Sequence, residues 1–442
     1  MHSSKMLHQT KECLLMKGRN VIALACAATL LMTSACNSAN RTQQTPTDGE
    51  SKEPIKLTVL QYLLNVTDED FSKLIAEPVK EKFPNITMEL VRKPANQSFE
   101  DMLTAGTFPD LMLQANFDIY KYTPLGLAED LNALVKKNNI DLTKFDPSII
   151  QTLKSYGAGG ELYMLPLYSN PAALYYNKDI FDRFGVPYPK DGITWEETIN
   201  LARQLSKTDG AQPYYGLDLI AAPRISASLL LPLFDSKTGK ASLTSDSWKS
   251  YFEMYKSIKD IPGNQTKGIF NDFEKNKNLA MMVAYNRLNQ LEELNKSGTA
   301  PNWDIVTFPS RKEAPLVKET DVSGLLLSTK SQHKKEAFKV MAFLTEKESQ
   351  ARMARRGLIP VIQDPEATKD FGADLASLKG KNVQALLKMK SSPNPQPTEY
   401  EEIIKDVINK SMNDYLKGKS DTNTILRQAE DEANKRIAEA KR

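Results

Sequence analysis

The sequence predicts an α/β fold, an open sheet with helices packed against it. Two observations support this: strands alternate with amphipathic helices from residue 55 onward, and the composition is that of a soluble globular protein, 40% hydrophobic and 26% charged. The chain has 442 residues. At roughly 100 to 200 residues per domain, that length accommodates two or three domains, or two lobes of one large fold.

The first elements follow one another at the spacing of βαβ units. Strand and helix are expected in turn over five ranges: 55–64, 68–83, 86–91, 99–105 and 110–113. Asp68 is the expected N-cap of the first helix. A ligand of such a sheet lies beyond the carboxyl ends of the strands. We therefore expect it near Gln61 and Tyr62, and near residues 114–118.

Later segments continue the alternation with stronger helices. Strands are expected at 161–166, 172–176, 279–284, 304–308 and 322–327. Helices are expected at 179–184, 195–205, 247–259 and 335–345, and over the last part of the chain. The helix at 195–205 carries a capping box, because Thr194 precedes it and Glu197 stands three residues on.

The charge balance argues against nucleic acid as a partner. Lys and Arg number 58 and Asp and Glu 55, a net charge of +3. The first 35 residues hold four of the basic residues and one of the acids, so 54 of each remain and the net charge beyond them is zero. Binding to phosphates needs a basic excess or patch.

His and Cys usage excludes several kinds of site. Beyond Cys36 the chain has one His, His333, and no Cys. Zinc sites, Cys–His nucleophiles and other soft-metal sites cannot be built there. A Ser-His-Asp triad would need His333, whose Lys-rich surroundings indicate a solvated helix start. We therefore expect no catalytic residue, cofactor or soft-metal site, while an oxygen-liganded Ca²⁺ stays open.

The N-terminus has the features of an export signal followed by a lipid anchor. Residues 21–32 form an apolar run, too short to span a bilayer and preceded by basic residues. It ends in Leu31-Met32-Thr33-Ser34-Ala35-Cys36, which resembles a bacterial lipobox. We expect residues 1–35 to be a signal peptide, with Met16 as a second candidate for the initiator. Residues 36–54 are then a lipidated Cys36 and a polar tether. In the alternative, the signal peptide is a plain one and Cys36 is incidental.

Six blocks resemble, in order, the extracellular solute-binding proteins of the maltose-binding type. They are Thr107-Phe108-Pro109-Asp110-Leu111, residues 162–166 with 174–178, Val186-Pro187 to 194–197, residues 279–283, residues 303–309 and residues 357–361. The resemblance runs from about residue 55 to the C-terminus. The lipid-anchored form is similar to binding lipoproteins of Gram-positive bacteria, whose relatives feed sugars to ABC transporters.

The resemblance implies a two-lobed periplasmic-binding-protein-like fold of type II, joined by a hinge. Lobe 1 is expected to comprise residues 55–166 plus 309–349, and lobe 2 residues 167–308 plus 350–442. The implied protein is a monomer on the extracellular face of the cell membrane. It is not an enzyme, it carries a sugar or oligosaccharide to the transporter's permease subunits, and it contacts the bilayer through its anchor.

Loops expected at the cleft carry aromatic and polar side chains together, as a sugar site requires. The candidate ligand-binding residues are Gln61, Tyr62, Gln114, Asn116, Asp118, Tyr168, Asn170, Arg224, Tyr285, Asn286, Arg287 and Tyr400. Residues 285–287 depart from the Gly and Trp that the family often has there, so the sequence does not name the sugar.

Other classes of function stay open. An exported glycoside hydrolase also needs a carbohydrate cleft, with two carboxylates at a set separation. A structural surface lipoprotein or an adhesin would have no solute at all. Within the binding class, a peptide, a polyamine or a metal ion could replace the sugar.

Overall fold

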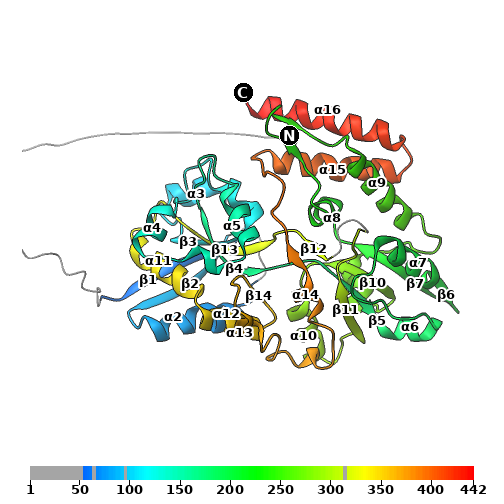
Figure 1. Ribbon diagram of the computed structural model, residues 1–442, viewed down its shortest axis with the longest axis horizontal. Helices are drawn as coiled ribbons and strands as arrows, with labels where there is room; N and C mark the ends of the chain where they lie inside the picture. The colour runs from blue at the N-terminus through cyan, green and yellow to red at the C-terminus, as the bar shows by residue number, and fades with distance from the viewer. Residues whose placement is uncertain (1–52, 62–65, 94–96, 312–315) are drawn as a thin grey trace, which may run out of the picture. The chain divides into compact units, whose positions relative to one another are not determined.

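The computed structural model describes residues 53–61, 66–93, 97–311 and 316–442. The predicted signal peptide, Cys36, nearly all of the tether and Tyr62 lie outside these residues. Figure 1 shows two separate sheets, each flanked by helices. We call the six-stranded sheet with its helices the first lobe, and the five-stranded sheet with its helices the second lobe. The two-lobed α/β architecture agrees with the prediction.

The first sheet has the strand order β14-β4-β13-β3-β1-β2. Its strands are β1 (Ile55–Gln61), β2 (Ile86–Arg92), β3 (Leu111–Ala115), β4 (Met164–Ser169), β13 (Val322–Leu327) and β14 (Ile359–Pro360). β1 pairs in parallel with β2 and β3, whereas β13 runs antiparallel to β3 and β4. The carboxyl ends of β1 and β3 therefore lie at one edge, which is the edge where the sequence predicts a ligand.

The second sheet has the order β11-β5-β10-β7-β6. Its strands are β5 (Ala173–Asn177), β6 (Lys207–Asp209), β7 (Gln212–Leu219), β10 (Leu279–Ala284) and β11 (Trp303–Thr307). Two small sheets complete the strands: β8 (Phe234–Asp235) with β9 (Lys240–Ala241), and β12 (Val317–Lys318) with β15 (Lys390–Ser391).

Helices surround both sheets. Those of the first half are α1 (Asp68–Phe71), η1 (Ser72–Ala76), α2 (Glu77–Lys82), α3 (Phe99–Thr104), η2 (Asn116–Lys121), α4 (Asn132–Lys137), η3 (Leu142–Lys144), α5 (Pro147–Lys154), α6 (Lys178–Phe184) and α7 (Trp195–Leu205). Those of the second half are α8 (Ala222–Ser228), α9 (Asp246–Lys259), η4 (Asn271–Lys275), α10 (Leu288–Lys296), α11 (Lys334–Leu344), α12 (Lys347–Arg355), α13 (Pro365–Thr368), η5 (Ala376–Leu378), α14 (Ala385–Lys388), α15 (Glu401–Leu416) and α16 (Thr422–Ala440).

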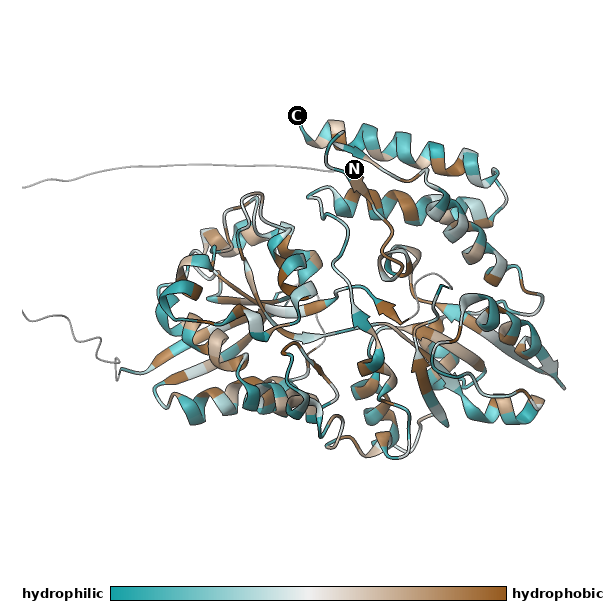
Figure 2. Cartoon of the chain, in the orientation of Figure 1, coloured by the Kyte–Doolittle hydropathy of each residue, from teal (hydrophilic) through white to brown (hydrophobic). Residues whose placement is uncertain are grey.

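Each sheet carries its own hydrophobic core. Figure 2 shows hydrophobic residues on the strands and hydrophilic ones along the outer side of helices such as α16. The second sheet is covered on both faces, and Trp248 and Trp303, which belong to different clusters, are both fully buried. Because both faces of this sheet are covered, side chains on both sides of its central strands are buried. This explains the continuous apolar sequence LAMMVA of β10.

The first helix departs from its prediction in two ways. Its N-cap is Thr67, whose hydroxyl accepts a hydrogen bond from the Asp70 N–H, so the assignment of Asp68 was wrong. Asp68 instead lies in the first turn, where a carboxylate is favoured by the helix dipole. The predicted single helix over 68–83 is also divided by the π-helical turn η1, which changes the direction of the side chains that follow it.

The chain crosses between the lobes at short segments. Residues 170–172 join β4 to β5 and include the buried Pro171. A second crossing joins β11 to β13, and its Asp321 carbonyl accepts hydrogen bonds from the Asn170 N–H at 2.8 Å and the Ser169 hydroxyl at 3.2 Å. The two crossings are therefore bonded to each other. The lobe boundaries given above stay a prediction, and β14, which lies beyond residue 350, pairs in the first sheet.

One close backbone approach fixes how α7 lies on the second sheet. Gly216 of β7 lies so near Ala202 of α7 that a Cβ there would stand 2.6 Å from the Ala202 Cα. The Gly216 N–H donates to the side chain of Asn264, which also bonds both backbone groups of Leu217. Only glycine allows this helix–strand contact.

Candidate functional site: the space between the lobes

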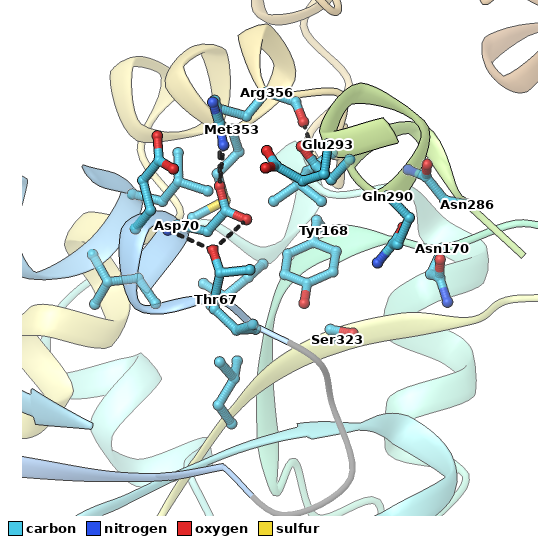
Figure 3. A pocket seen from close by; sticks show the side chains of 18 residues that line it. Thr67, Asp70, Tyr168, Asn170, Asn286, Gln290, Glu293, Ser323, Met353 and Arg356 are labelled. Carbon is cyan, nitrogen blue, oxygen red and sulfur yellow. Dashed lines mark hydrogen bonds and ion pairs between the residues drawn. The ribbon is translucent and has the colours of Figure 1, made fainter. Parts of the chain in front are cut away.

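A cavity of about 470 Å³ lies between the carboxyl edge of the first sheet and helix α10 of the second lobe. Its walls from the first lobe come from α1, η1, β3, β4, β13 and the end of α12. Figure 3 shows the Tyr168 ring inside it, with Asn170, Asn286 and Gln290 along one side and Thr67, Asp70 and Arg356 along the other. The cavity therefore offers one aromatic face among polar groups.

Asp70 and Arg356 form one rigid wall of this cavity. Both the Nε and the Nη2 of Arg356 donate to Asp70 Oδ1, at 3.1 and 2.6 Å. Their side chains are 11% and 13% exposed, so this is a largely buried ion pair. The Thr67 hydroxyl donates to the other carboxylate oxygen of Asp70 at 3.0 Å. A polar wall held in this way is pre-organised for a ligand.

Asn286 forms part of the opposite wall and also bridges the lobes. It follows β10, and its Nδ2 donates to the Gly357 carbonyl at 2.7 Å. Its Oδ1 accepts from the Leu288 N–H at 3.0 Å, which holds the start of α10. Asn289 of α10 donates to the Arg356 carbonyl at 3.2 Å, so residues 286–289 are bonded twice to the segment that follows α12.

Tyr168 has a phenol that stays protonated over the physiological pH range. Burial is the main cause, and it raises the pKa of the phenol to about 12. Tyr168 pairs with Ser323 across β4 and β13. A neutral hydroxyl beside an apolar ring face suits contact with a sugar ring and one of its hydroxyls.

A second group of predicted residues meets on the other side of the crossings; we call it the Arg224 cluster (Phe117, Asp118, Arg224, Tyr285 and Glu319). The Arg224 guanidinium carbon lies 5.3 Å from the centre of the Phe117 ring and 5.5 Å from that of the Tyr285 ring. The Tyr285 hydroxyl donates to Glu319 Oε1 at 2.8 Å. Arg224 thus joins an aromatic ring of the first lobe to one of the second.

Asp118 lies in this cluster but is not an exposed loop carboxylate. It is 8% exposed, in the 3₁₀ helix η2, and pairs with Lys121 at 2.8 Å. The sequence motif after β3 gave no indication of η2, which brings Asp118 inward.

Other predicted residues have structural partners. Asn116 is fully buried, donates to the Tyr156 hydroxyl at 3.3 Å and accepts from the Val322 N–H at 3.0 Å. Arg287 pairs with Glu274 at 2.6 Å and lies over the Phe270 ring. Neither lines the cavity of Figure 3.

Three predicted residues lie apart from both groups. Gln61 ends β1 and is 8% exposed. Gln114 is fully buried in β3, and its amide has no hydrogen-bond partner among the described residues. Tyr400 caps α15 and packs its ring 5.9 Å from that of Phe234. The structure therefore brings Tyr168, Asn170 and Asn286 together, and Asp118, Arg224 and Tyr285 together.

The sequence did not single out Asp70, Asn289, Gln290, Glu319 or Arg356. Asp70 and Arg356 read as ordinary charged residues at helix ends. Glu319 lies in the crossing segment, where no periodic pattern sets it apart. The signal that could have found Asn289 and Gln290 was their place in the first turn of α10, which begins three residues after Tyr285.

The described residues lack two kinds of feature. They contain no group of three or more His, Cys, Asp or Glu side chains placed to hold a metal ion. Within the same ranges, every helix is too short or too polar to cross a bilayer.

A family model of bacterial extracellular solute-binding proteins matches residues 66–351, more than half of the chain. The chain belongs to this family. The match spans strands of both sheets, both segments that join the two sheets and the cavity residues up to Ser323. It confirms the family that the six sequence blocks indicated, whose members bind solutes.

Solved structures share the fold. An ABC substrate-binding protein of Listeria monocytogenes in complex with cycloalternan has a TM-score of 0.71 at 18% identity, over 87% of this chain and 100% of that one. A sugar transporter of Rhizobium etli in an open conformation gives 0.68 at 22%, over 86% and 99%. The sugar-binding protein MalE of Xanthomonas citri gives 0.66 at 18%, over 88% and 98%. At these identities the likeness concerns the two-lobed fold.

Proposed function

We propose that this protein captures a sugar or oligosaccharide between its lobes and delivers it to the permease of an ABC transporter. The observation that carries the proposal is the interlobe cavity, in which the Tyr168 ring is surrounded by the amides of Asn170, Asn286 and Gln290. Aromatic faces pack on the C–H faces of sugars, and amides bond their hydroxyls. The solved structures with a similar fold include one in complex with cycloalternan and one of a sugar-binding protein, which supports a sugar as the solute here.

In this proposal, the ligand-binding residues are divided between two groups. Tyr168, Asn170 and Asn286 act from the large cavity, while Asp118, Arg224 and Tyr285 act from the Arg224 cluster. The other candidates named from the sequence stay predictions with no place in either group: Gln61, Tyr62, Gln114, Asn116, Arg287 and Tyr400.

Solute binding is expected to stabilise the protein and to draw the lobes together. A solute at 100 times its dissociation constant adds about 2.7 kcal/mol to the free energy of unfolding. We expect a rise in melting temperature with one or more saccharides, and a smaller radius of gyration in solution scattering at saturation. A panel of amino acids and peptides serves as the control. Steady release of products from an oligosaccharide would replace the binding function with that of a glycoside hydrolase.

We also propose that the protein is anchored on the extracellular face of a Gram-positive cell membrane through lipidated Cys36. The apolar run, the lipobox-like motif and the polar tether support this, and each buried methylene adds about 0.8 kcal/mol of membrane affinity. Cys36→Ala is expected to release the protein into the medium or leave it unprocessed, as measured by fractionation and immunoblotting. Cys26→Ala, inside the apolar run, is the matched control. Processed Cys36→Ala protein that stays in the membrane would contradict the anchor.

A further inference from the structure

A buried carboxylate in the Arg224 cluster has one oxygen bonded and the other without a partner. Glu319 is 2% exposed, and its Oε1 accepts hydrogen bonds from the Ser228 hydroxyl at 2.6 Å and the Tyr285 hydroxyl at 2.8 Å. Its Oε2 has no hydrogen-bond partner among the described residues. Leaving a buried acceptor unsatisfied costs free energy, and such groups are kept where a function uses them.

Glu319 lines a small cavity between the lobes. The cavity has a volume of about 40 Å³, and its other walls include Phe117, Ser226, Thr398 and Glu401. About 10 to 15 Å³ holds one water-sized group. The cavity therefore has room for one amino or hydroxyl substituent of a larger molecule, and not for a sugar ring.

The charges around this cavity do not balance. Asp118 pairs with Lys121 at 2.8 Å and Glu401 pairs with Lys405 at 2.7 Å, so four of these groups cancel.

Among the described residues near this cavity, Arg224 is then the cation that these two ion pairs leave over for Glu319 and Asp321, which are both nearly fully buried. No ion pair to either carboxylate occurs in the part of the chain that the structure describes. One negative charge stays uncompensated when both are ionised.

A proton is one way to remove that charge. Burial raises the pKa of both carboxyls, and repulsion from Glu319 helps to bring the pKa of Asp321 to about 8. The ionisable groups that act on the pair are Asp118 of η2, Tyr168 of β4, Arg224 of α8, Tyr285 after β10 and Lys405 of α15. Tyr156 and Glu401 line the same small cavity, and Lys121 pairs with Asp118. A cation placed in the cavity would remove the same charge without a proton.

We propose that Glu319 is a specificity-determining residue and that the small cavity receives a protonated amine of the solute, which makes aminated sugars the preferred class. This rests on the proposed sugar-binding function and names its substrate class. The amine donates to Glu319 Oε2 and stays an ammonium ion. The proton that Glu319 and Asp321 share before binding goes to the buffer.

The test is isothermal titration of the purified full-length protein at pH 7 with three matched sets of sugars. The first set is glucose, glucosamine and N-acetylglucosamine, and the second is galactose, galactosamine and N-acetylgalactosamine. The third set consists of the β-1,4-linked dimers of the sugars in the first set. We expect the free amine of at least one set to bind about tenfold or more tightly than its neutral and N-acetyl partners. In buffers of different ionisation enthalpy, the amine should release about one proton per site and the neutral sugars none.

Glu319→Gln is expected to abolish both the preference and the proton release while neutral sugars still bind. Glu348→Gln, which removes the same charge from the exposed surface of α12 and lines neither cavity, should keep both. Amines that bind no more tightly than their neutral partners would overturn the inference and leave the sugar function standing. If no saccharide of any set binds, both fail. Preference retained in Glu319→Gln would place the amine elsewhere and overturn the role of Glu319.

Discussion

Tyr285→Ala is expected to weaken solute binding at least about tenfold in calorimetric titration. An aromatic contact contributes about 0.5 to 1.5 kcal/mol beyond its buried area. Loss of the ring also removes one of the two faces that hold the Arg224 guanidinium, and loss of the hydroxyl leaves Glu319 Oε1 with one donor. Three features of the cluster therefore change at once.

Two variants separate these contributions. Tyr285→Phe keeps the ring over Arg224 and removes only the bond to Glu319, so we expect a smaller loss of affinity than for alanine. Tyr214→Ala removes a ring that packs on Phe184 in the second lobe and does not belong to the Arg224 cluster, and it should bind as the unaltered protein does. Unchanged affinity of Tyr285→Ala would show that the solute does not lie against the Arg224 cluster.

Gly216→Ala should lower the free energy of unfolding by at least about 2 kcal/mol. Overpacking of a core costs about 1 to 3 kcal/mol, and here the added methyl meets the backbone of Ala202, which cannot move aside as a flexible side chain would. Urea denaturation measures the change as a lower midpoint at unchanged slope.

Gly268→Ala is the matched control for this stability test. Its added methyl would stand 3.7 Å from the nearest atom of Asn271, an ordinary contact, and its backbone is not left-handed. We expect a change within about 0.5 kcal/mol. A Gly216→Ala protein as stable as this control would mean that α7 does not lie on β7 as described.

Much of the fold could be predicted because its signals are local. The strand LAMMVA is apolar along its whole length, and the capping box of Thr194 and Glu197 marks the start of α7 to the residue. Two of the helices that were missed have no side-chain cap to mark their start. α8 begins in the sequence Ala222-Pro223-Arg224, and α10 begins after Arg287.

The site was harder to predict because it depends on contacts distant in sequence. Tyr168 could be named from its position beside a crossing, and Tyr285 from its place at the end of the strand expected at 279–284. The partners of Tyr285 could not, since Glu319 lies 34 residues away and only the fold brings its carboxylate to the phenol. The same holds for Asp70 and Arg356, whose ion pair spans 286 residues. The periodicity of a sequence predicts which face of a helix or strand a side chain lies on. It does not predict which residues of other helices or strands contact that side chain.

Pro171, buried in the crossing between β4 and β5, has a consequence for the entropy of closure. A proline samples fewer backbone conformations than any other residue, and this segment has only three residues. The Asn170 N–H beside it is already held by the Asp321 carbonyl of the second crossing. We therefore expect the solute-free protein to explore a narrower range of lobe orientations than an unrestrained linker would allow. Less orientational freedom is then lost on capture, so more of the contact energy appears as affinity.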